Sequence, residues 1–110
     1  MKLPSGERAL IDERKLVDYC LSETHDDGKH KARLFRELVG ISVDDAPFLL
    51  EALQHAAVSE QANLGKQDRY GQRYVIDFEL HGPQGDATVR SVWIVLAAES
   101  FPRFVSCYIL

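Results

Sequence analysis

The hydrophobic pattern divides the chain into two parts with different periodicities. In the first part, apolar residues recur three and four positions apart, as they do on one face of a helix. After about residue 70, apolar and polar residues alternate or apolar residues run on continuously, which is typical of strands. The pattern predicts an α+β domain with three N-terminal helices followed by an antiparallel sheet of three to four strands.

The three helices are expected at about residues 12 to 22, between residue 28 and Gly40, and from residue 44 to near Ser59. An acidic residue that can cap a helix stands at each expected start, namely Asp12, Asp26 or Asp27, and Asp44. Gly40 is a typical C-terminal stop. Residues 1 to 10 are interpreted as an N-terminal arm or an edge segment.

Three strands are expected at about residues 73 to 80, 88 to 97 and 103 to 110, after a polar connector at 63 to 69. Their loops are too short for helical crossovers, so the sheet should be an antiparallel meander. One face must take the helices, and the other is free for function. The expected core joins strand residues to helix residues: Ile76, Val92, Ile94, Val105 and Cys107 against Leu16, Phe35, Leu38 and Leu53.

Composition fits one domain over residues 1–110, with 45% hydrophobic and 27% charged residues. No apolar run approaches the roughly 20 residues that span a bilayer, and no apolar signal-peptide core follows the first residues. We therefore expect a cytoplasmic protein with no membrane partner. The net charge of -4 argues against a nonspecific binder of duplex DNA, which needs many phosphate contacts from Lys and Arg.

The cysteines and histidines indicate neither a metal nor a cofactor. Cys20 and Cys107 each lie in an apolar pattern, and we expect two reduced, buried thiols without a disulfide. His25 and His30 lack the i, i+4 spacing of a helical metal pair, and no nucleotide-binding or metalloprotease motif is present. Trp93 and Tyr74 are expected in the core, His55 in a structural role, and His81 exposed in a turn.

The segment HDDGKHKARLF, residues 25 to 35, is the strongest candidate for chemistry, and it has two interpretations. Its cations can form an ordinary solvated helix face. Alternatively, Gly28, Lys29 and His30 bind an anion at the helix start, where free N–H groups favour negative charge. His25 and Lys31 would then act on a bound phosphodiester.

Metal-free RNA cleavage needs a base for the 2′-hydroxyl proton, an acid for the leaving oxygen and a cation beside the phosphorane. Histidine suits the first two tasks because it titrates near neutral pH. Arginines of the strands can supply further charge, and Ser91 and Ser106 can face an open site. The sequence does not establish that these groups converge.

Several motifs, spread over nearly the whole chain, resemble those of an uncharacterised bacterial domain family of about this length. The shared elements are KLxxYxL, HxxGxxKAxxF, YGxxY, a VWIVL-like strand and a terminal PRFV. Here they are Lys15-Leu16-Val17-Asp18-Tyr19-Cys20-Leu21; His25 with Gly28, Lys31, Ala32 and Phe35; Tyr70-Gly71 with Tyr74; Val92-Trp93-Ile94-Val95-Leu96; and Pro102-Arg103-Phe104-Val105.

At the level of fold, helices followed by an antiparallel sheet, with HxxGxxKAxxF at a helix start, are similar to toxin ribonucleases of the barnase, colicin D and RelE-like type. The resemblance implies RNA as substrate, and it implies His25 and Lys31 as a helix-borne pair. Arg103, with Ser106 or Tyr74, would act from the sheet. The acidic net charge departs from this expectation, since RNA is anionic.

A second hypothesis is a non-enzymatic protein of immunity or antitoxin type, with a protein partner encoded nearby. An acidic surface suits a basic partner. A third is an accessory module without separate activity. Clustering of His25, Lys31 and Arg103 on one concave surface would favour the ribonuclease, whereas an acidic or apolar docking face would favour the partner-binding protein.

Overall fold

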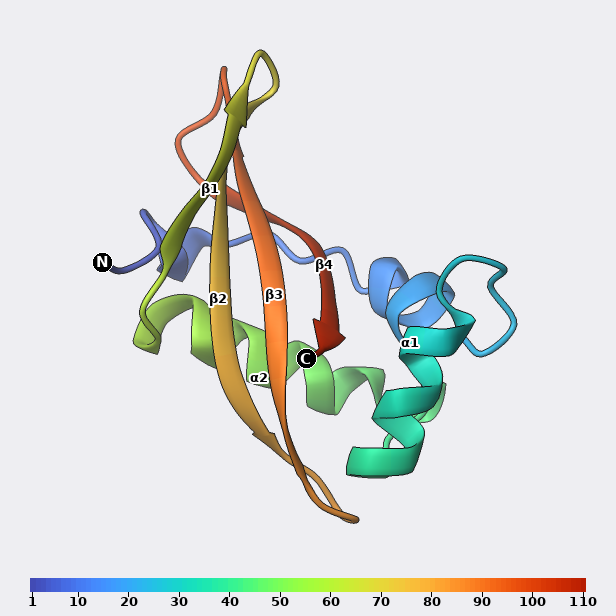
Figure 1. Cartoon of the computed structure of the whole chain (residues 1–110). Coiled ribbons are helices and arrows are strands. Elements are labelled where there is room, and N and C mark those ends of the chain that lie inside the picture. Colours follow the sequence, from blue (N-terminus) through green and yellow to red (C-terminus); the bar gives the residue numbers. More distant parts are fainter.

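The computed structural model describes residues 1–110, and it has α+β architecture with a four-stranded antiparallel sheet (Figure 1). The helical segments precede the sheet in the chain. Helix α2 lies across one face of the sheet, and α1 lies beyond β4. The main elements are α1 (Lys29–Leu34), α2 (Ala46–Ser59), β1 (Asn63–Asp68), β2 (Gly71–His81), β3 (Asp86–Leu96) and β4 (Pro102–Ile109).

The sheet is a meander in the order β1-β2-β3-β4, as the short loops predicted. The three expected strands are present, and β1 is a fourth that replaces the expected polar connector. Asp68 pairs with Gly71 across a two-residue turn, and the Tyr70 N–H donates to Asp68 Oδ1. Gly71 has φ of 153°, and a Cβ there would lie 2.1 Å from the Val95 carbonyl oxygen, so this corner requires glycine.

The helical part is more broken than expected, with short 3₁₀ and π turns between the helices. The first expected helix is a turn followed by the π-helix η2 (Leu16–Cys20), and the second is α1 continued by the π-helix η3 (Phe35–Val39). Apolar spacing of three and four residues suits either kind of helix, so the pattern could not distinguish them. Gly40 ends η3 with φ of 84°, as predicted.

Helix α2 matches the third expected helix closely. The 3₁₀ turn η4 (Val43–Asp45) leads into it, with a capping box between Ser42 and Asp45. Asp44, the expected cap, therefore lies inside this first turn. Pro47 sits in the first turn of α2, where its missing N–H has no intrahelical partner to lose.

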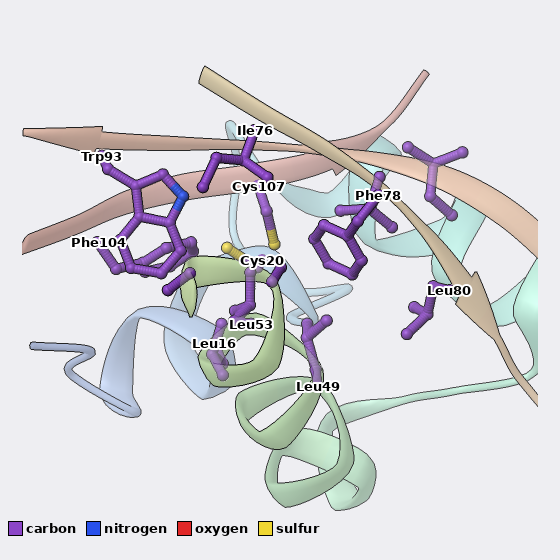
Figure 2. Close-up of a cluster of buried hydrophobic side chains, with 14 of the residues drawn as sticks. Leu16, Cys20, Leu49, Leu53, Ile76, Phe78, Leu80, Trp93, Phe104 and Cys107 are labelled. Carbon is purple, nitrogen blue, oxygen red and sulfur yellow. The ribbon is translucent and has the colours of Figure 1, made fainter. Parts of the chain in front are cut away.

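The core lies between α2 and the inner face of the sheet (Figure 2). Trp93 is fully buried and packs edge-on against Phe104, with ring centroids 5.4 Å apart. Its indole N–H donates to Ser91 Oγ at 2.9 Å, and this hydroxyl donates to the Ile76 carbonyl oxygen at 2.8 Å. Ser91 therefore satisfies a core tryptophan, which corrects the expectation that it faces an open site.

Most of the expected core residues are buried, but three are not. Val92 and Val105 are half-buried on the outer face of the sheet, where Val92 pairs with Val75 and Ser106. Leu38 is 48% exposed. The wider turns of η3 explain the last error, because Phe35 and Val39 remain buried while Leu38 rotates away from them.

The N-terminal segment is held at both of its ends. Lys2 pairs with Gln61, and Leu10 makes a parallel bridge with Arg103. Met1 and Lys2 thus lie near the start of β1, and Leu10 lies near the start of β4. None of the helices is long and apolar enough to cross a membrane.

Candidate functional site

His25 organises the turn that starts α1. Its Nδ1 accepts the backbone N–H groups of Asp27 and Gly28 at 3.0 and 3.1 Å, and its ring packs edge-on against Tyr19 with centroids 4.7 Å apart. Nδ1 therefore serves as the acceptor nitrogen of the ring, and Nε2 is the nitrogen that can donate. Nε2 has no partner within the protein.

Three backbone N–H groups at the start of α1 find acceptors in His25. The N–H groups of Asp27 and Gly28 bind His25 Nδ1, and the Lys29 N–H donates to the His25 carbonyl oxygen at 2.9 Å. The expected cap by Asp26 or Asp27 is absent, and His25 replaces it. Lys29 is half-buried and His30 is exposed. The amides of Asp27, Gly28 and Lys29 are therefore engaged within the chain, and anion binding by Gly28, Lys29 and His30 stays a prediction.

Lys31 projects from α1 onto β4. Its Nζ lies 4.7 Å from the centre of the Tyr108 ring, a cation–π contact. Tyr108 is opposite Arg90 on β3, and Arg90 in turn is opposite Asp77 on β2. Lys31, Tyr108, Arg90 and Asp77 thus form one row across the outer face of the sheet.

Two adjoining pockets lie beside this row and share Lys15 and Tyr19 as a common wall. One pocket, of about 350 Å³, is also lined by Asp12, Arg14, Asp18 and His25, and the other, of about 320 Å³, by Val105 and Ser106. We call these two pockets together the β4-edge hollow. They bring His25 from the loop before α1 and Ser106 from β4 to one concave surface, although 81 positions separate them in the sequence.

The two cysteines lie directly beneath the hollow. Ser106 Oγ is 3.9 Å from Cys20 Sγ, and Figure 2 shows the sulfur atoms of Cys20 and Cys107 side by side. Both cysteines are buried, as predicted, and their thiols are free. The hydrogen bond with Cys107 lowers the pKa of Cys20 to about 7 against the opposing effect of burial. The same bond, together with burial, raises the pKa of Cys107 well above its ordinary value.

Arg103 and Tyr74, the other two predicted site residues, lie away from the hollow. Arg103 binds Glu99 through two hydrogen bonds of 2.7 and 2.6 Å, and its guanidinium stacks on Phe101. Tyr74 is buried in the core cluster on the inner face of the sheet. The fold thus brings His25, Lys31 and Ser106 to the same edge and keeps Arg103 and Tyr74 apart from them.

Ion pairing distinguishes the arginines of the sheet from the lysines at its edge. Arg73, Arg90 and Arg103 each have a carboxylate partner, at 3.0, 2.8 and 2.6 Å. Lys15 and Lys31 have none. Lys15 Nζ donates to the Phe104 carbonyl oxygen at 3.0 Å, which fixes its position without neutralising its charge. At the β4 edge, Lys15 and Lys31 therefore carry positive charge that no carboxylate neutralises.

Four residues of this edge were not singled out from the sequence: Lys15, Asp18, Tyr19 and Tyr108. The first three lie in the KLxxYxL element, which was noted in the sequence as a shared motif. Their spacing is also that of the polar face of an ordinary helix, so the motif alone did not indicate a site. Their convergence with β4 depends on η2 packing against that strand. No group of three or more His, Cys, Asp or Glu side chains is arranged to hold a metal ion.

Comparison with known proteins identifies a family and solved structures with a similar fold. The profile of a family described as "Domain of unknown function (DUF6883)" matches residues 2–110. No curated protein matches the chain. A chain from the "Contact-dependent growth inhibition toxin - immunity protein complex from Klebsiella pneumoniae 342" superposes with a TM-score of 0.69 at 15% sequence identity, and the match covers 96% of each chain. At that identity the likeness establishes a shared fold.

Proposed function

We propose that this chain, which belongs to the DUF6883 family, is a small toxin-like ribonuclease that needs no metal and binds RNA in the β4-edge hollow. One observation carries the proposal. His25, Lys15, Tyr19 and Ser106 line one concave surface, with Lys31 on the neighbouring Tyr108. These are the side-chain types that metal-free phosphodiester cleavage uses.

The hydrogen bonds of His25 support a specific part for it in this proposal. Because Nδ1 accepts two backbone N–H groups, Nε2 is the ring nitrogen left for a ligand. In this proposal the ring donates through Nε2–H to a phosphate oxygen. This role differs from the acid–base role that histidine most often has in metal-free cleavage.

Proton transfer then falls to other groups at the hollow. Asp18 lines the same pocket as His25 and has no cationic partner within ion-pair distance, so its carboxylate can take the 2′-hydroxyl proton. The ammonium group of Lys15 or Lys31 gives a proton to the leaving 5′ oxygen and stabilises the phosphorane. The products are a 2′,3′-cyclic phosphate and a free 5′-hydroxyl.

The test is cleavage of a labelled single-stranded RNA and of bulk transfer RNA by purified protein in EDTA. Wild type should cut RNA and leave 2′,3′-cyclic phosphate ends. Asp18→Asn and Lys31→Ala should each lower the rate by about 100-fold or more, the usual cost of removing a proton-transfer or charge-stabilising group. His25→Asn should also lose activity yet keep the turn, because an Asn side-chain oxygen can accept the same two N–H groups.

Lys66→Ala is the matched control, since Lys66 lies on β1 at the opposite edge of the sheet. It should cleave RNA at the wild-type rate. If purified wild type cuts no RNA under these conditions, or if Lys66→Ala loses as much activity as Lys31→Ala, the ribonuclease proposal fails.

A non-enzymatic partner-binding protein of immunity or antitoxin type is the second candidate. The net charge of -4 favours it, because a basic partner would be attracted. The fold shared with a chain of a toxin–immunity complex suits either role. Expression in a bacterial host separates them: a ribonuclease toxin should stop growth and the Asp18→Asn variant should not, whereas an immunity-type protein should leave growth unchanged.

A further inference from the structure

The outer edge of β2 is only half covered. Strand β1 pairs with β2 from Gly71 to Val75, and β2 continues alone to His81 (Figure 1). Apart from the ladder to β3, the backbone groups of residues 76 to 81 make no hydrogen bond to another backbone group. Every second residue there therefore presents a free N–H and C=O, the arrangement to which an extended segment can add.

A groove runs along this free edge. It has a volume of about 420 Å³ and is lined by Asp77, Glu79 and His81 of β2 together with His55 and Glu60 of α2 and its C-terminal cap. We call it the β2-edge groove. A second pocket of about 300 Å³ shares His55 and adds Phe48, whose side chain is exposed. The free edge thus has an α-helical wall with an apolar end.

The charged side chains that line the groove determine which kind of ligand it can bind. Glu60 and Glu79 have no cationic partner within ion-pair distance, and Asp77 is the one carboxylate of the groove that an arginine neutralises. The groove therefore repels RNA and attracts cationic side chains. A second copy of this chain, paired edge to edge, would bring these carboxylates against one another.

We propose that the β2-edge groove binds an extended basic segment of a protein partner, which adds to the sheet as a strand beside residues 76 to 81. An added strand lies about 4.8 Å from β2, with its side chains alternating between the two faces. Lysines or arginines on one face meet Glu79 and Asp77. Apolar side chains on the other face meet the α2 wall and Phe48. The inference does not rest on RNA cleavage, because the β4-edge hollow lies across the sheet from this groove.

The probe is a fluorescent, end-capped peptide of about six residues that alternates lysine and valine, titrated into the full chain and followed by anisotropy. Two comparison peptides separate charge from strand addition. One replaces every lysine by glutamate, and the other is N-methylated along one edge so that it cannot pair with a strand. The alternating lysine peptide should bind, and both comparison peptides should bind at least about tenfold more weakly.

Two protein variants locate the site. Glu79→Lys should weaken binding of the lysine peptide by about tenfold, whereas Glu7→Lys, an equal charge change at an exposed residue of the N-terminal segment, should change it less than about twofold. Hydrogen exchange should show that the peptide protects the amides of residues 76 to 81. RNA cleavage by Glu79→Lys should match wild type, which separates this site from the hollow.

Four results would overturn the proposal: no binding by the lysine peptide, equal binding of the N-methylated peptide, equal loss in Glu7→Lys, or protection outside residues 76 to 81. Concentration-dependent protection of the same amides without peptide, together with a doubled mass in solution, would assign the edge to a second copy of the chain instead.

Discussion

At the residue scale, buried polar contacts satisfy hydrogen-bonding groups in the core, although no sequence pattern identifies the partners. The Trp93 indole and Ser91 illustrate this, since the serine hydroxyl both accepts from the indole and donates to the Ile76 carbonyl. The apolar run around Trp93 correctly predicted a core tryptophan. It could not identify the hydroxyl that satisfies the indole, because the two residues meet only through the pleat and pairing of the strand.

Ser91→Ala should lower the free energy of unfolding by about 1–3 kcal/mol, because it leaves the buried indole N–H without an acceptor. Urea unfolding measures this, with Ser100→Ala as the control at an exposed serine. A loss below about 0.5 kcal/mol would mean that the hydroxyl is dispensable.

The thiol pair makes a second prediction at this scale. A hydrogen bond with Cys107 favours the Cys20 thiolate, so thiolate absorbance at 240 nm should reveal one group per native chain that ionises as the pH rises through about 7. Cys20→Ala should abolish this step, and Cys107→Ala should move it upward. Two thiols should be counted in denaturant without reductant. A titration in which both thiols ionise together near their ordinary values would contradict the assignment.

The ion pair between Asp77 and Arg90 links stability to pH. Hydrogen bonds from Arg90 lower the pKa of the Asp77 carboxyl below its unfolded value, with desolvation opposing the effect. The stabilisation is therefore complete above the unfolded pKa and is lost as the pH falls through the folded pKa. Asp77→Asn should lower the Tm by no more than a few degrees near pH 6, because both side chains are partly exposed. Below pH 3 the difference should shrink, and a difference that grows with acid would contradict the pairing.

At the element scale, alternation predicted the strands well but missed β1. The sequence of β1, NLGKQD, is polar and mostly exposed, so no buried face imposes a period of two. Its strand character comes from the turn at Gly71 and from pairing with β2. The broken helices were missed for a different reason, since α and π turns place similar residues on the buried face.

The contact between η2 and α1 shapes the hollow, and Gly28 controls it. A Cβ at Gly28 would lie 2.8 Å from the Tyr19 carbonyl oxygen and 3.3 Å from its ring. Gly28→Ala should therefore push Tyr19 and His25 apart, lower the Tm and reduce RNA cleavage. Gly65→Ala is the matched control, because its Cβ would make ordinary contacts at 3.4 Å. Equal effects of the two substitutions on the Tm and on RNA cleavage would mean that the close approach of Tyr19 does not depend on glycine at position 28.

At the scale of the whole molecule, the two proposed sites lie at different edges of one sheet and differ in the charges that line them. Lys15 and Lys31, which have no carboxylate partner, lie at the β4 edge together with Asp18, whereas Glu60 and Glu79 lie without a cationic partner at the β2 edge.

The composition shows only the net charge of the whole chain, which is -4 and argues against an anionic partner such as RNA. The net charge does not show that two lysines converge at one edge. His25, Lys31 and Ser106 could be proposed in advance from their residue types, but Lys15 and Asp18 could not, because their place depends on η2 packing against β4.

RNA binding should depend on salt only to the extent that two lysines contact phosphate. For single strands, the slope of log K against log salt is about -0.7 per contact, so we expect about -1.4 for wild type and about -0.7 for Lys31→Ala. Binding of an uncleavable oligonucleotide at several salt concentrations measures both slopes. An unchanged slope in Lys31→Ala would remove Lys31 from the RNA contact.

The most direct test of the account is an NMR titration of the ¹⁵N-labelled chain with an oligonucleotide whose 2′-hydroxyl at the cleavage position is replaced by hydrogen. If RNA binds in the β4-edge hollow, amide signals should change there, at Lys15, Tyr19, His25, Lys31 and Ser106, while those of residues 76 to 81 stay in place. Changes confined to the β2 edge, or none at saturating oligonucleotide, would contradict it.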